Sequence, residues 1–512
     1  MLTTWKYETY QATDKGIYLF KPALAQHINW QRLCAYDQFM VVLGYLAIRP
    51  LVIVIALAAL LTGCEKPTTL EKIQKHETLH VITRNAPSVY YEGREGPMGF
   101  EYELALLFAK ELDLTLDIKV ASTRSQILSA LDNEYTNFAA AAMVASEDRA
   151  EKYQYSLPYM ETTPIVVYRY GSVRPRKIQD IIGKNIAVVS DSYHTEELDT
   201  LKKQAPELLW TAIDVETIDL MKMVQDKEID YAIITSSELD IHQAYYPRVK
   251  KGFAIGESQK ISWYFPKNTD KTLLAKADQF FEKIESDGTL LNLKERYFGH
   301  LGQLNYVGAR TFIKHINSRL PKYDEMFKKY SEEKDVDWRL MASMGYQESH
   351  WRSRATSPTG VRGLMMLTRV TAKEMGIKNR LDAESSIKGG TRYFAKMRAR
   401  ISEKIAEPDR TWFALAAYNV GYGHLEDARI LTEKGGKDPN IWMDVKEFLP
   451  LLQKKKYYKQ TRYGYARGNE PVIYVQNIRR YFDVLTWMTQ PQADEHTIAQ
   501  TDLETGLINF IQ

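Results

Sequence analysis

The segment from Asp337 to Trp351 carries one acidic residue on the apolar face of a predicted helix. Met341, Met344 and Glu348 recur at the spacing of a single helix face, so Glu348 projects from the side that packs inward. A carboxyl group that is partly withdrawn from water holds its proton more tightly, which a general acid requires at neutral pH. The spacing equally fits a buried structural glutamate that a nearby arginine neutralises, and the candidates for that role are Arg352, Arg354 and Arg362.

Three later segments supply further groups that could line a site. The turn at 357–368 is rich in glycine, which permits close approach of the backbone to a ligand. The helix predicted at 412–420 places the Asn419 amide on the same face as Trp412, and Tyr474 adds a phenol on a later helix. Each segment alone fits core packing as well as it fits a site. In chain order the candidate residues are Gly363, Leu364, Met365, Tyr418, Asn419 and Tyr474.

The predicted helix offers no second carboxyl group beside Glu348. Asp335 and Asp337 precede it by thirteen and eleven residues, which is about three helical turns or more. Most glycosidases pair two carboxyl groups across the bond they cleave, so this helix alone does not form such a site. The 10 histidines are scattered and form no His-Glu-x-x-His pattern. We therefore expect neither a metal nor another cofactor.

The chain resembles the lysozyme-like lytic transglycosylases in four motifs, which are Glu348-Ser349, Gly363-Leu364-Met365, Tyr418-Asn419 and Tyr474. The resemblance implies that Glu348 protonates the glycosidic oxygen between N-acetylmuramic acid and N-acetylglucosamine in peptidoglycan. The same carboxylate then accepts the proton of the muramic C6 hydroxyl, which closes a 1,6-anhydro ring without consuming water. A lysozyme-type hydrolase is the alternative enzyme, and the chemistry of the product separates the two.

The resemblance also implies a role for the other motif residues. Ser349 would orient the catalytic carboxyl group, and Tyr474 would act on the proton at or near it. Tyr418 and Asn419 would contact N-acetyl or hydroxyl groups of the sugars. Backbone groups at 363–365 would line the cleft, and the glycan strand is the expected partner.

Upstream of the acid, short β-rich runs alternate with helical stretches, a pattern that predicts an α/β sheet fold. Beyond Phe298 the strands nearly vanish, and amphipathic helices separated by Gly- or Pro-containing turns predict an all-α domain. The predicted strands are 79–83, 114–120, 163–168, 185–190 and 229–235, and the first helix of this part spans 99–112.

The α/β part resembles the family-3 solute-binding proteins, which hold amino acids between two hinged lobes. The resemblance rests on Gly99-Phe100-Glu101, on 146–159 and on 181–190. It implies a two-lobed fold in which Arg149 grips a ligand α-carboxylate, as a planar guanidinium can. An ion pair of Arg149 with Asp148 or Glu151 on the surface is the alternative.

One feature departs from that family. An aspartate for the ligand's amino group usually follows the strand that corresponds to 230–235, whereas Thr235-Ser236-Ser237 stand here. A hydroxyl group cannot offset an ammonium charge as a carboxylate does. An amino acid, a wall peptide or no ligand at all therefore stay open for this domain. A receptor that is anchored to the wall and has no catalysis is accordingly the non-enzyme alternative for the whole chain.

The N-terminal part predicts export. The apolar run 51–61 is too short for a bilayer span, which needs about 20 residues, but it suits a secretory signal. Leu61-Thr62-Gly63-Cys64 resembles the bacterial lipoprotein signal, in which the cysteine is lipidated. We expect a signal peptide at 40–63 that begins at Met40, and an anchor on the periplasmic face of the outer membrane. A single transmembrane anchor is the alternative.

Length and charge limit the number of domains and the classes of protein that the sequence can represent. The 512 residues predict two to four domains, and we expect these segments: a misassigned extension at 1–39, a linker at 64–78, a binding-protein-like domain at 79–299, the transglycosylase-like domain at 303–490 and a polar tail at 491–512. Two cysteines exclude a disulfide scaffold, and a net charge of +3 argues against nucleic acid as a partner. The basic, tyrosine-rich stretch 454–467 is interpreted as a solvated face or a wall-facing surface on which rings stack against sugars.

Overall fold

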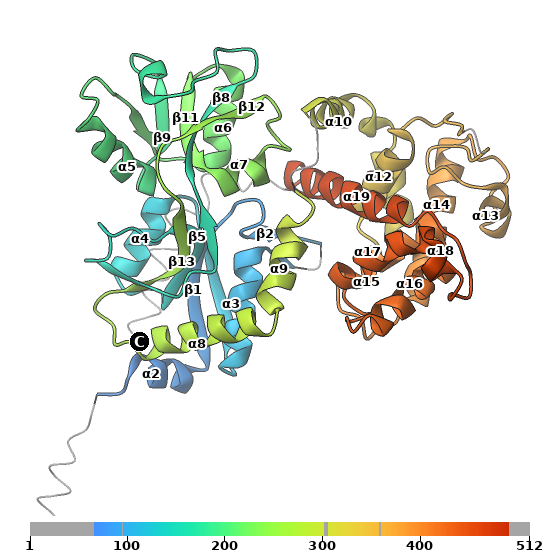
Figure 1. The fold of residues 1–512 in the computed structure, drawn as a ribbon, viewed down its shortest axis with the longest axis horizontal. Helices are drawn as coiled ribbons and strands as arrows, with labels where there is room; N and C mark the ends of the chain where they lie inside the picture. The colour runs from blue at the N-terminus through green and yellow to red at the C-terminus, as the bar shows by residue number, and fades with distance from the viewer. Residues whose placement is uncertain (1–65, 95, 302–305, 358–359, 491–512) are drawn as a thin grey trace, which may run out of the picture. The chain divides into compact units, whose positions relative to one another are not determined.

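The computed structural model describes residues 66–94, 96–301, 306–357 and 360–490. The predictions for 1–39, for the signal at 40–63, for Cys64 and for the tail at 491–512 lie outside the described residues. No helix in the described ranges is long and apolar enough to cross a membrane. The α/β elements run from 69 to 298, and the elements that follow are helical (Figure 1).

The first sheet forms one lobe of the α/β part. Its strands are β1 (Thr78–Arg84), β4 (Thr115–Ala121), β5 (Phe138–Val144), β6 (Tyr153–Tyr155), β7 (Met160–Thr162) and β13 (Gln259–Pro266). The order is β4-β1-β5-β13-β6, and β7 also pairs with β13. β1 is parallel to β4 and β5, whereas β13 is antiparallel to β5.

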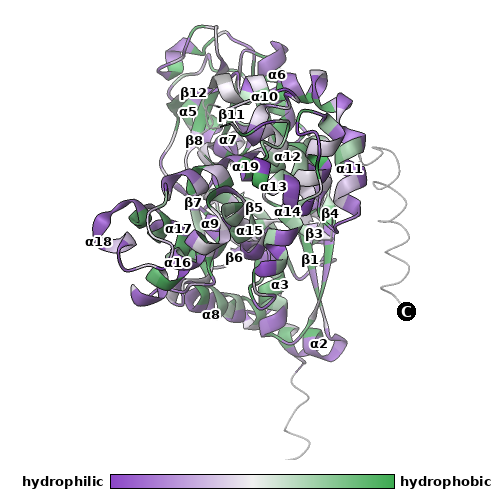
Figure 2. Cartoon of the chain, turned by 90° about the vertical axis from the view of Figure 1, so that its right-hand side faces the viewer, coloured by the Kyte–Doolittle hydropathy of each residue, from purple (hydrophilic) through white to green (hydrophobic). Residues whose placement is uncertain are grey.

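Helices cover both faces of this sheet, because the central strands are apolar on both sides. Phe138 and Ala140 of β5 face α3, whereas Ala139 and Ala141 face α4 on the opposite side. Figure 2 shows apolar residues along the strands and polar residues on outer helix faces. The helices of this lobe are α2 (Thr69–His76), α3 (Phe100–Glu111), α4 (Arg124–Asp132), α8 (Thr272–Ser286) and α9 (Thr289–Phe298).

The second sheet forms the other lobe, with the order β10-β9-β11-β8-β12. Its elements are β8 (Pro164–Arg169), β9 (Ile186–Val189), α5 (Tyr193–Lys202), β10 (Thr211–Ile213), α6 (Thr217–Asp226), β11 (Tyr231–Thr235), α7 (Ser236–His242) and β12 (Val249–Ala254). β9 and β11 are parallel, and β8 is antiparallel to β11. The predicted two-lobed α/β fold is confirmed.

The remaining described residues form a helical domain around one core. Its helices are α10 (Tyr306–Ser318), α11 (Asp324–Glu332), α12 (Trp338–Ser349), α13 (Arg369–Glu374), α14 (Ala383–Arg400), α15 (Asp409–Val420), α16 (Tyr422–Lys434), α17 (Trp442–Phe448), α18 (Lys455–Tyr458) and α19 (Asn469–Met488). α12 packs against α11 and α19, and α15 packs against α14, α16 and α19. The predicted all-α domain is confirmed. α12, α15 and α19 carry Glu348, Tyr418 and Tyr474, and the candidate residues 363–365 lie between α12 and α13.

Candidate active site

α12 carries Glu348 at its C-terminal end. Met341, Met344 and Gly345 of the same helix are buried, and Glu348 itself is half-buried. Tyr474 of α19 donates a hydrogen bond from Oη to Glu348 Oε1 at 2.7 Å. Burial raises the pKa of Glu348 to about 7, although the hydrogen bond from Tyr474 acts to lower it. A carboxyl group with this pKa can both give and take a proton near neutral pH.

No described arginine forms an ion pair with Glu348. Arg352 instead donates from Nε to the carbonyl of Ser349 at 3.0 Å. Burial and the hydrogen bond from Tyr474 account for the pKa of Glu348, and no neighbouring charge contributes to it in the described chain. The structure therefore does not support the alternative of a neutralised structural glutamate.

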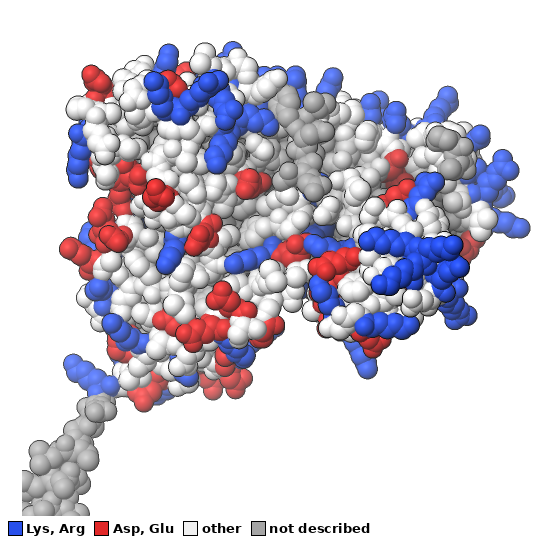
Figure 3. Space-filling model, viewed as in Figure 1, with Lys and Arg blue, Asp and Glu red and all other residues white. Residues whose placement is uncertain are grey.

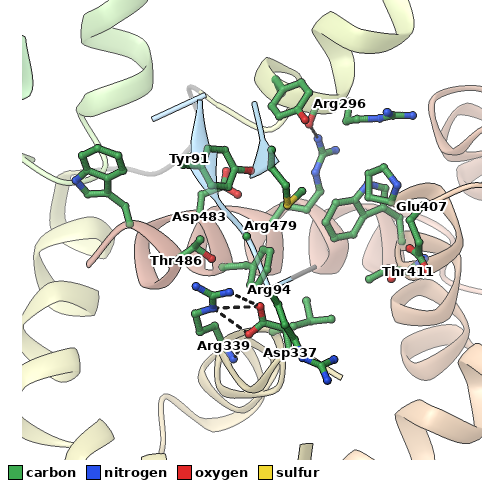
Figure 4. Close-up of a pocket in the computed structure, with 18 of the residues that line it drawn as sticks. Tyr91, Arg94, Arg296, Asp337, Arg339, Glu407, Thr411, Arg479, Asp483 and Thr486 are labelled. Carbon is green, nitrogen blue, oxygen red and sulfur yellow. Dashed lines mark hydrogen bonds and ion pairs between the residues drawn. The ribbon is translucent and has the colours of Figure 1, made fainter. Parts of the chain in front are cut away.

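The other end of α12 is fixed by Asp337, the N-cap residue. Its side chain accepts a hydrogen bond from the backbone N–H of Arg339 at 2.8 Å and pairs with the Arg339 guanidinium at 2.6 Å (Figure 4). Asp337 and Arg339 line the pocket drawn in that figure, whereas Glu348 does not. Asp337 is thus committed to the helix start and supplies no second carboxyl group at the acid.

Two tyrosines lie side by side next to the acid. The rings of Tyr418 and Tyr474 are stacked, with centroids 6.4 Å apart and planes 11° apart. Tyr418 donates its hydroxyl group to the carbonyl of Met365 at 3.1 Å, so only Tyr474 donates to Glu348. The structure thereby brings together residues that the sequence places in four separate motifs.

The Gly363-Leu364-Met365 segment packs against α12, the helix that carries Glu348. Leu364 and Met365 are fully buried, and a Cβ on Gly345 would lie 2.9 Å from Leu364 and 3.2 Å from Met365. Gly363 has φ +93°, and a Cβ there would lie 1.8 Å from the carbonyl oxygen of Arg380. Its close approach is therefore to the protein's own backbone, whereas the sequence suggested approach to a ligand.

Two other residues differ from expectation. The Ser349 hydroxyl donates to the carbonyl of Gly345 at 3.2 Å and accepts from the N–H of Arg352 at 3.1 Å, so it secures the helix end and does not bond the Glu348 carboxyl group. Asn419 is exposed, although its spacing predicted that the amide faces packed surface. It lies in the last turn of α15.

Comparison with known proteins identifies the architecture. Residues 79–300 match the bacterial extracellular solute-binding proteins, family 3, and 325–441 match the Transglycosylase SLT domain. Membrane-bound lytic murein transglycosylase F of Hahella chejuensis is 53% identical over 451 residues, which cover 87% of this chain and 89% of that protein. The chain belongs to this family. The predicted family and the predicted enzyme, a lytic murein transglycosylase, are confirmed.

A second relative supports the same family assignment. The protein of the same name from Ectopseudomonas mendocina is 48% identical over 449 residues, covering 87% of this chain and 92% of that one. A solved structure of the P235GK mutant of ArgBP from T. maritima is 20% identical, with a TM-score of 0.41, and covers 45% of this chain and 99% of that one.

In the α/β part of the transglycosylase, Arg149 faces a carboxylate from the opposite lobe. Its Nε donates to Glu196 Oε1 at 2.5 Å, and Ser146 of the first lobe bonds the other oxygen of the same carboxylate. Glu196 belongs to α5 of the second lobe. Neither alternative partner, Asp148 or Glu151, forms this pair. The guanidinium of Arg149, which the family resemblance assigns to a ligand carboxylate, is thus paired with Glu196 of the chain itself.

A second group of charges crosses the lobes and was missed from the sequence. Arg84, at the end of β1, contacts Glu216 at 2.5 Å and Glu238 at 3.3 Å. Arg124, at the start of α4, contacts Glu238 at 2.8 Å. Both arginines come from the first lobe and both glutamates from the second. All four side chains are buried.

A carboxylate does follow β11, at Glu238, but it pairs with Arg84 and Arg124 of the other lobe. Thr235 and Glu238 form a capping box, in which the Thr235 hydroxyl accepts from the Glu238 N–H at 3.2 Å and Glu238 accepts from the Thr235 N–H at 3.2 Å. The pattern Thr235-Ser-Ser-Glu238 is the sequence signature of this motif, and it could have located the residue.

The charges set the protonation states of this cluster. Burial acts to raise the pKa of Glu238, but Arg124 and Arg84 outweigh it and hold this pKa well below its usual range. Burial lowers the pKa of His194 to about 4 and that of His242 to about 3. At neutral pH Glu238 is therefore ionised, and His194 and His242 are neutral.

Proposed function

We propose that Glu348 is the single acid and base of a non-hydrolytic cleavage of peptidoglycan. The protonated carboxyl group donates its proton to the glycosidic oxygen between N-acetylmuramic acid and N-acetylglucosamine as the C1–O bond breaks. The 2-acetamido group of the muramic residue stabilises the developing positive charge at C1. Glu348, now ionised, takes the proton of the C6 hydroxyl while that oxygen bonds to C1. The product ends in 1,6-anhydro-muramic acid, and Glu348 is protonated again.

The observation that carries this proposal is a half-buried carboxyl group with a pKa of about 7 and one hydrogen-bond donor, Tyr474. Such a group is protonated and ionised in comparable amounts at neutral pH, which suits a residue that acts first as acid and then as base. We assign Tyr474 to positioning the carboxyl group and Tyr418 and Asn419 to contacts with the sugars. The backbone at 363–365 would line the cleft, and Ser349 would act only through the end of α12.

The test is mass spectrometry of the products that the full chain releases from purified sacculi. We expect anhydro-muropeptides from the native chain and none from Glu348→Gln. The matched control is Glu374→Gln, which alters an exposed glutamate of α13 that pairs with Lys396. Reducing ends that carry one extra water would make the protein a lysozyme-type hydrolase. No cleavage by the native chain would favour a receptor without catalysis.

We further propose that the chain is anchored on the periplasmic face of the outer membrane through lipidated Cys64, after removal of a signal at 40–63. The support is the lipoprotein-like sequence around Cys64, together with relatives that are named membrane-bound. The proposed domain limits are 79–299 and 303–490. Mass measurement of the membrane-extracted protein tests the anchor. A Cys64→Ala chain that still carries acyl mass would contradict it.

For the α/β domain we propose a wall peptide or an amino acid as ligand, with Arg149 binding its carboxylate. The ligand carboxylate would replace Glu196, which holds that place in the structure. Titration calorimetry of the full chain with free wall tetrapeptide and with single amino acids tests this. A carboxylate-dependent signal that Arg149→Lys weakens is expected, and equal binding by both chains would contradict the assignment.

A further inference from the structure

The residues 454–467, here called the basic-aromatic loop, form a strongly cationic surface on the helical domain. The loop contains α18 and the turn that leads into α19. Its cationic residues are all exposed and are Lys454, Lys455, Lys456, Lys459, Arg462 and Arg467. Within the described ranges only Arg467 of these has an ion-pair partner, Glu470, at 3.2 Å. Figure 3 shows the resulting basic cluster over α18, and α18 is hydrophilic in Figure 2.

Aromatic rings are exposed within the same surface. Tyr463 is 52% exposed and Tyr465 is 55% exposed. The guanidinium of Arg462 lies 5.5 Å from the centre of the Tyr463 ring. The rings of Tyr458 and Tyr465 are perpendicular, with their centroids 5.8 Å apart. A solvated face needs no exposed rings, whereas flat apolar rings beside cations suit a ligand that has both sugar faces and negative charges.

The loop is held in place by buried contacts. Asp427 of α16 is 1% exposed, and its carboxylate accepts the backbone N–H groups of Arg462 at 3.0 Å and Tyr463 at 2.8 Å. The Tyr463 ring covers Gly423, where an added Cβ would lie 2.8 Å from ring atoms. Because the buried Asp427 carboxylate accepts two backbone N–H groups of the loop, it fixes the backbone there and therefore the direction in which the side chains point.

The loop adjoins the elements that bear the candidate site. Gly423 lies at the start of α16, directly after α15, which carries Tyr418. At its other end the loop runs into α19, which carries Tyr474. The loop is therefore directly joined in the chain to α19 and packs against the start of α16.

We infer that the basic-aromatic loop is a docking surface for the carboxylate-bearing peptide stems of the glycan strand, with Tyr463 and Tyr465 against sugar faces. The inference rests on the proposed function, because the strand bound here is the substrate. Peptide stems carry free carboxylates at irregular positions. Long, flexible lysines suit such positions better than rigid guanidinium forks do. The surface raises the local concentration of strand and leaves the chemistry to Glu348.

The test measures binding to sacculi by co-sedimentation, with the full chain in neutral detergent and Glu348→Gln in every sample so that nothing is cleaved. The loop variant is K454Q/K455Q/K456Q/K459Q. The matched control is K72Q/K75Q/K110Q/K203Q, which removes the same charge from exposed lysines of the α/β part. At 50 mM NaCl we expect the loop variant to bind about tenfold more weakly and the control to bind normally. Equal binding by both variants would overturn the inference.

Chemical modification of the wall and a parallel binding assay with lipid vesicles identify the partner. Sacculi whose carboxylates are converted to methylamides should bind the unaltered loop as weakly as native sacculi bind the loop variant. If the loop variant binds sacculi normally but loses binding to phosphatidylglycerol vesicles, the surface serves lipid headgroups and the inference is wrong. Substitution Y463A/Y465A should weaken binding to native and modified sacculi alike, because stacking does not depend on carboxylates.

Failure of the inference can be told apart from failure of the proposed function. Anhydro-muropeptides from the native chain together with unchanged binding by the loop variant would defeat only the docking surface. Charge-dependent binding without anhydro products would defeat only the proposed chemistry.

Discussion

Tyr474 donates to Glu348 Oε1 at 2.7 Å, whereas its stacked neighbour Tyr418 donates to a backbone carbonyl. The two adjacent phenols therefore differ in the group that accepts their hydrogen bond. Tyr474→Phe removes a donor from a carboxyl group that must ionise during the reaction, so we expect kcat to fall about tenfold to a hundredfold. Tyr418→Phe is the matched control. We expect it to change substrate binding more than kcat, measured by release of anhydro-muropeptides over time.

The pH dependence of activity tests the roles of Tyr474 and Tyr418 in a second way. The hydrogen bond from Tyr474 lowers the pKa of Glu348, so its loss should move that pKa upward. Activity of Tyr474→Phe should accordingly persist to higher pH than that of the native chain, although at a lower level. Identical profiles for both tyrosine variants would show that Tyr474 does not position the acid.

The acid also predicts the pH dependence of the native chain. Cleavage begins with protonated Glu348, whose pKa burial raises to about 7. We expect kcat/KM to decline above about pH 7 and to approach a tenfold loss per pH unit at higher pH. Initial rates on soluble glycan strands between pH 5 and pH 9 measure this. A profile that is flat to pH 9 would assign the proton to another group.

Ionisation of Glu348 should also lower the stability of the folded protein at alkaline pH. Its pKa is raised in the folded protein, so the folded state binds more protons between the usual value near 4.5 and about 7. Stability from this group is complete below that window and is lost as the pH rises through it. Glu348→Gln should therefore stabilise the helical domain at pH 8.5 by about 2 kcal/mol, and little at pH 4. Thermal unfolding at both pH values measures the effect, with Glu374→Gln unchanged.

Gly363 offers a test of the support beneath the acid. An alanine there would place Cβ 1.8 Å from the Arg380 carbonyl at φ +93°, so we expect a loss of about 3 kcal/mol in unfolding free energy. Gly376→Ala is the control, because Gly376 has φ +73° but nothing within 4 Å of an added Cβ, and it should cost about 1 kcal/mol. Equal losses would mean that the contact with Arg380 relaxes freely.

The sequence predicted the fold because periodicity and turns are local properties. Runs rich in Val and Ile, such as β9 and β11, were found to within a residue or two. β5 was missed, because Phe138-Ala-Ala-Ala-Ala-Met-Val144 is alanine-rich and alanine has weak strand preference. Only its burial between α3 and α4 makes it a central strand, and that contact is not local.

The candidate site divides in the same way. Motif order brought Glu348, Tyr418 and Tyr474 into one prediction, and the structure places them together. The partners of Ser349 and the exposure of Asn419 depend on where helices end and on what packs beside them, which spacing does not specify. The pairs that Arg84 and Arg124 form across the lobes join residues more than a hundred positions apart, such as Arg84 and Glu238.

Those pairs predict how the α/β part responds when one partner is lost. Glu238→Gln removes the buried carboxylate that pairs with Arg124, whereas Arg84 keeps Glu216, and breaking such a buried pair costs about 3 kcal/mol. We expect the lobes to separate, so amide hydrogen exchange should accelerate in β11 and α7. Asp226→Asn, which breaks an exposed pair with Lys222 at 3.1 Å, is the control and should leave exchange unchanged.

Acid should weaken the same cluster. The pKa values of His194 and His242 are lowered in the folded protein to about 4 and about 3, so the unfolded chain binds more protons below about pH 6.5. Their contribution to stability is present above that pH and is lost as the pH falls. Glu238, whose pKa is also lowered, adds a loss in the same direction at still lower pH. Exchange in α7 should therefore accelerate between pH 6.5 and pH 4, after correction for the intrinsic rate. Constant protection across that range would show that the lobes are held together by apolar contacts and not by these charges.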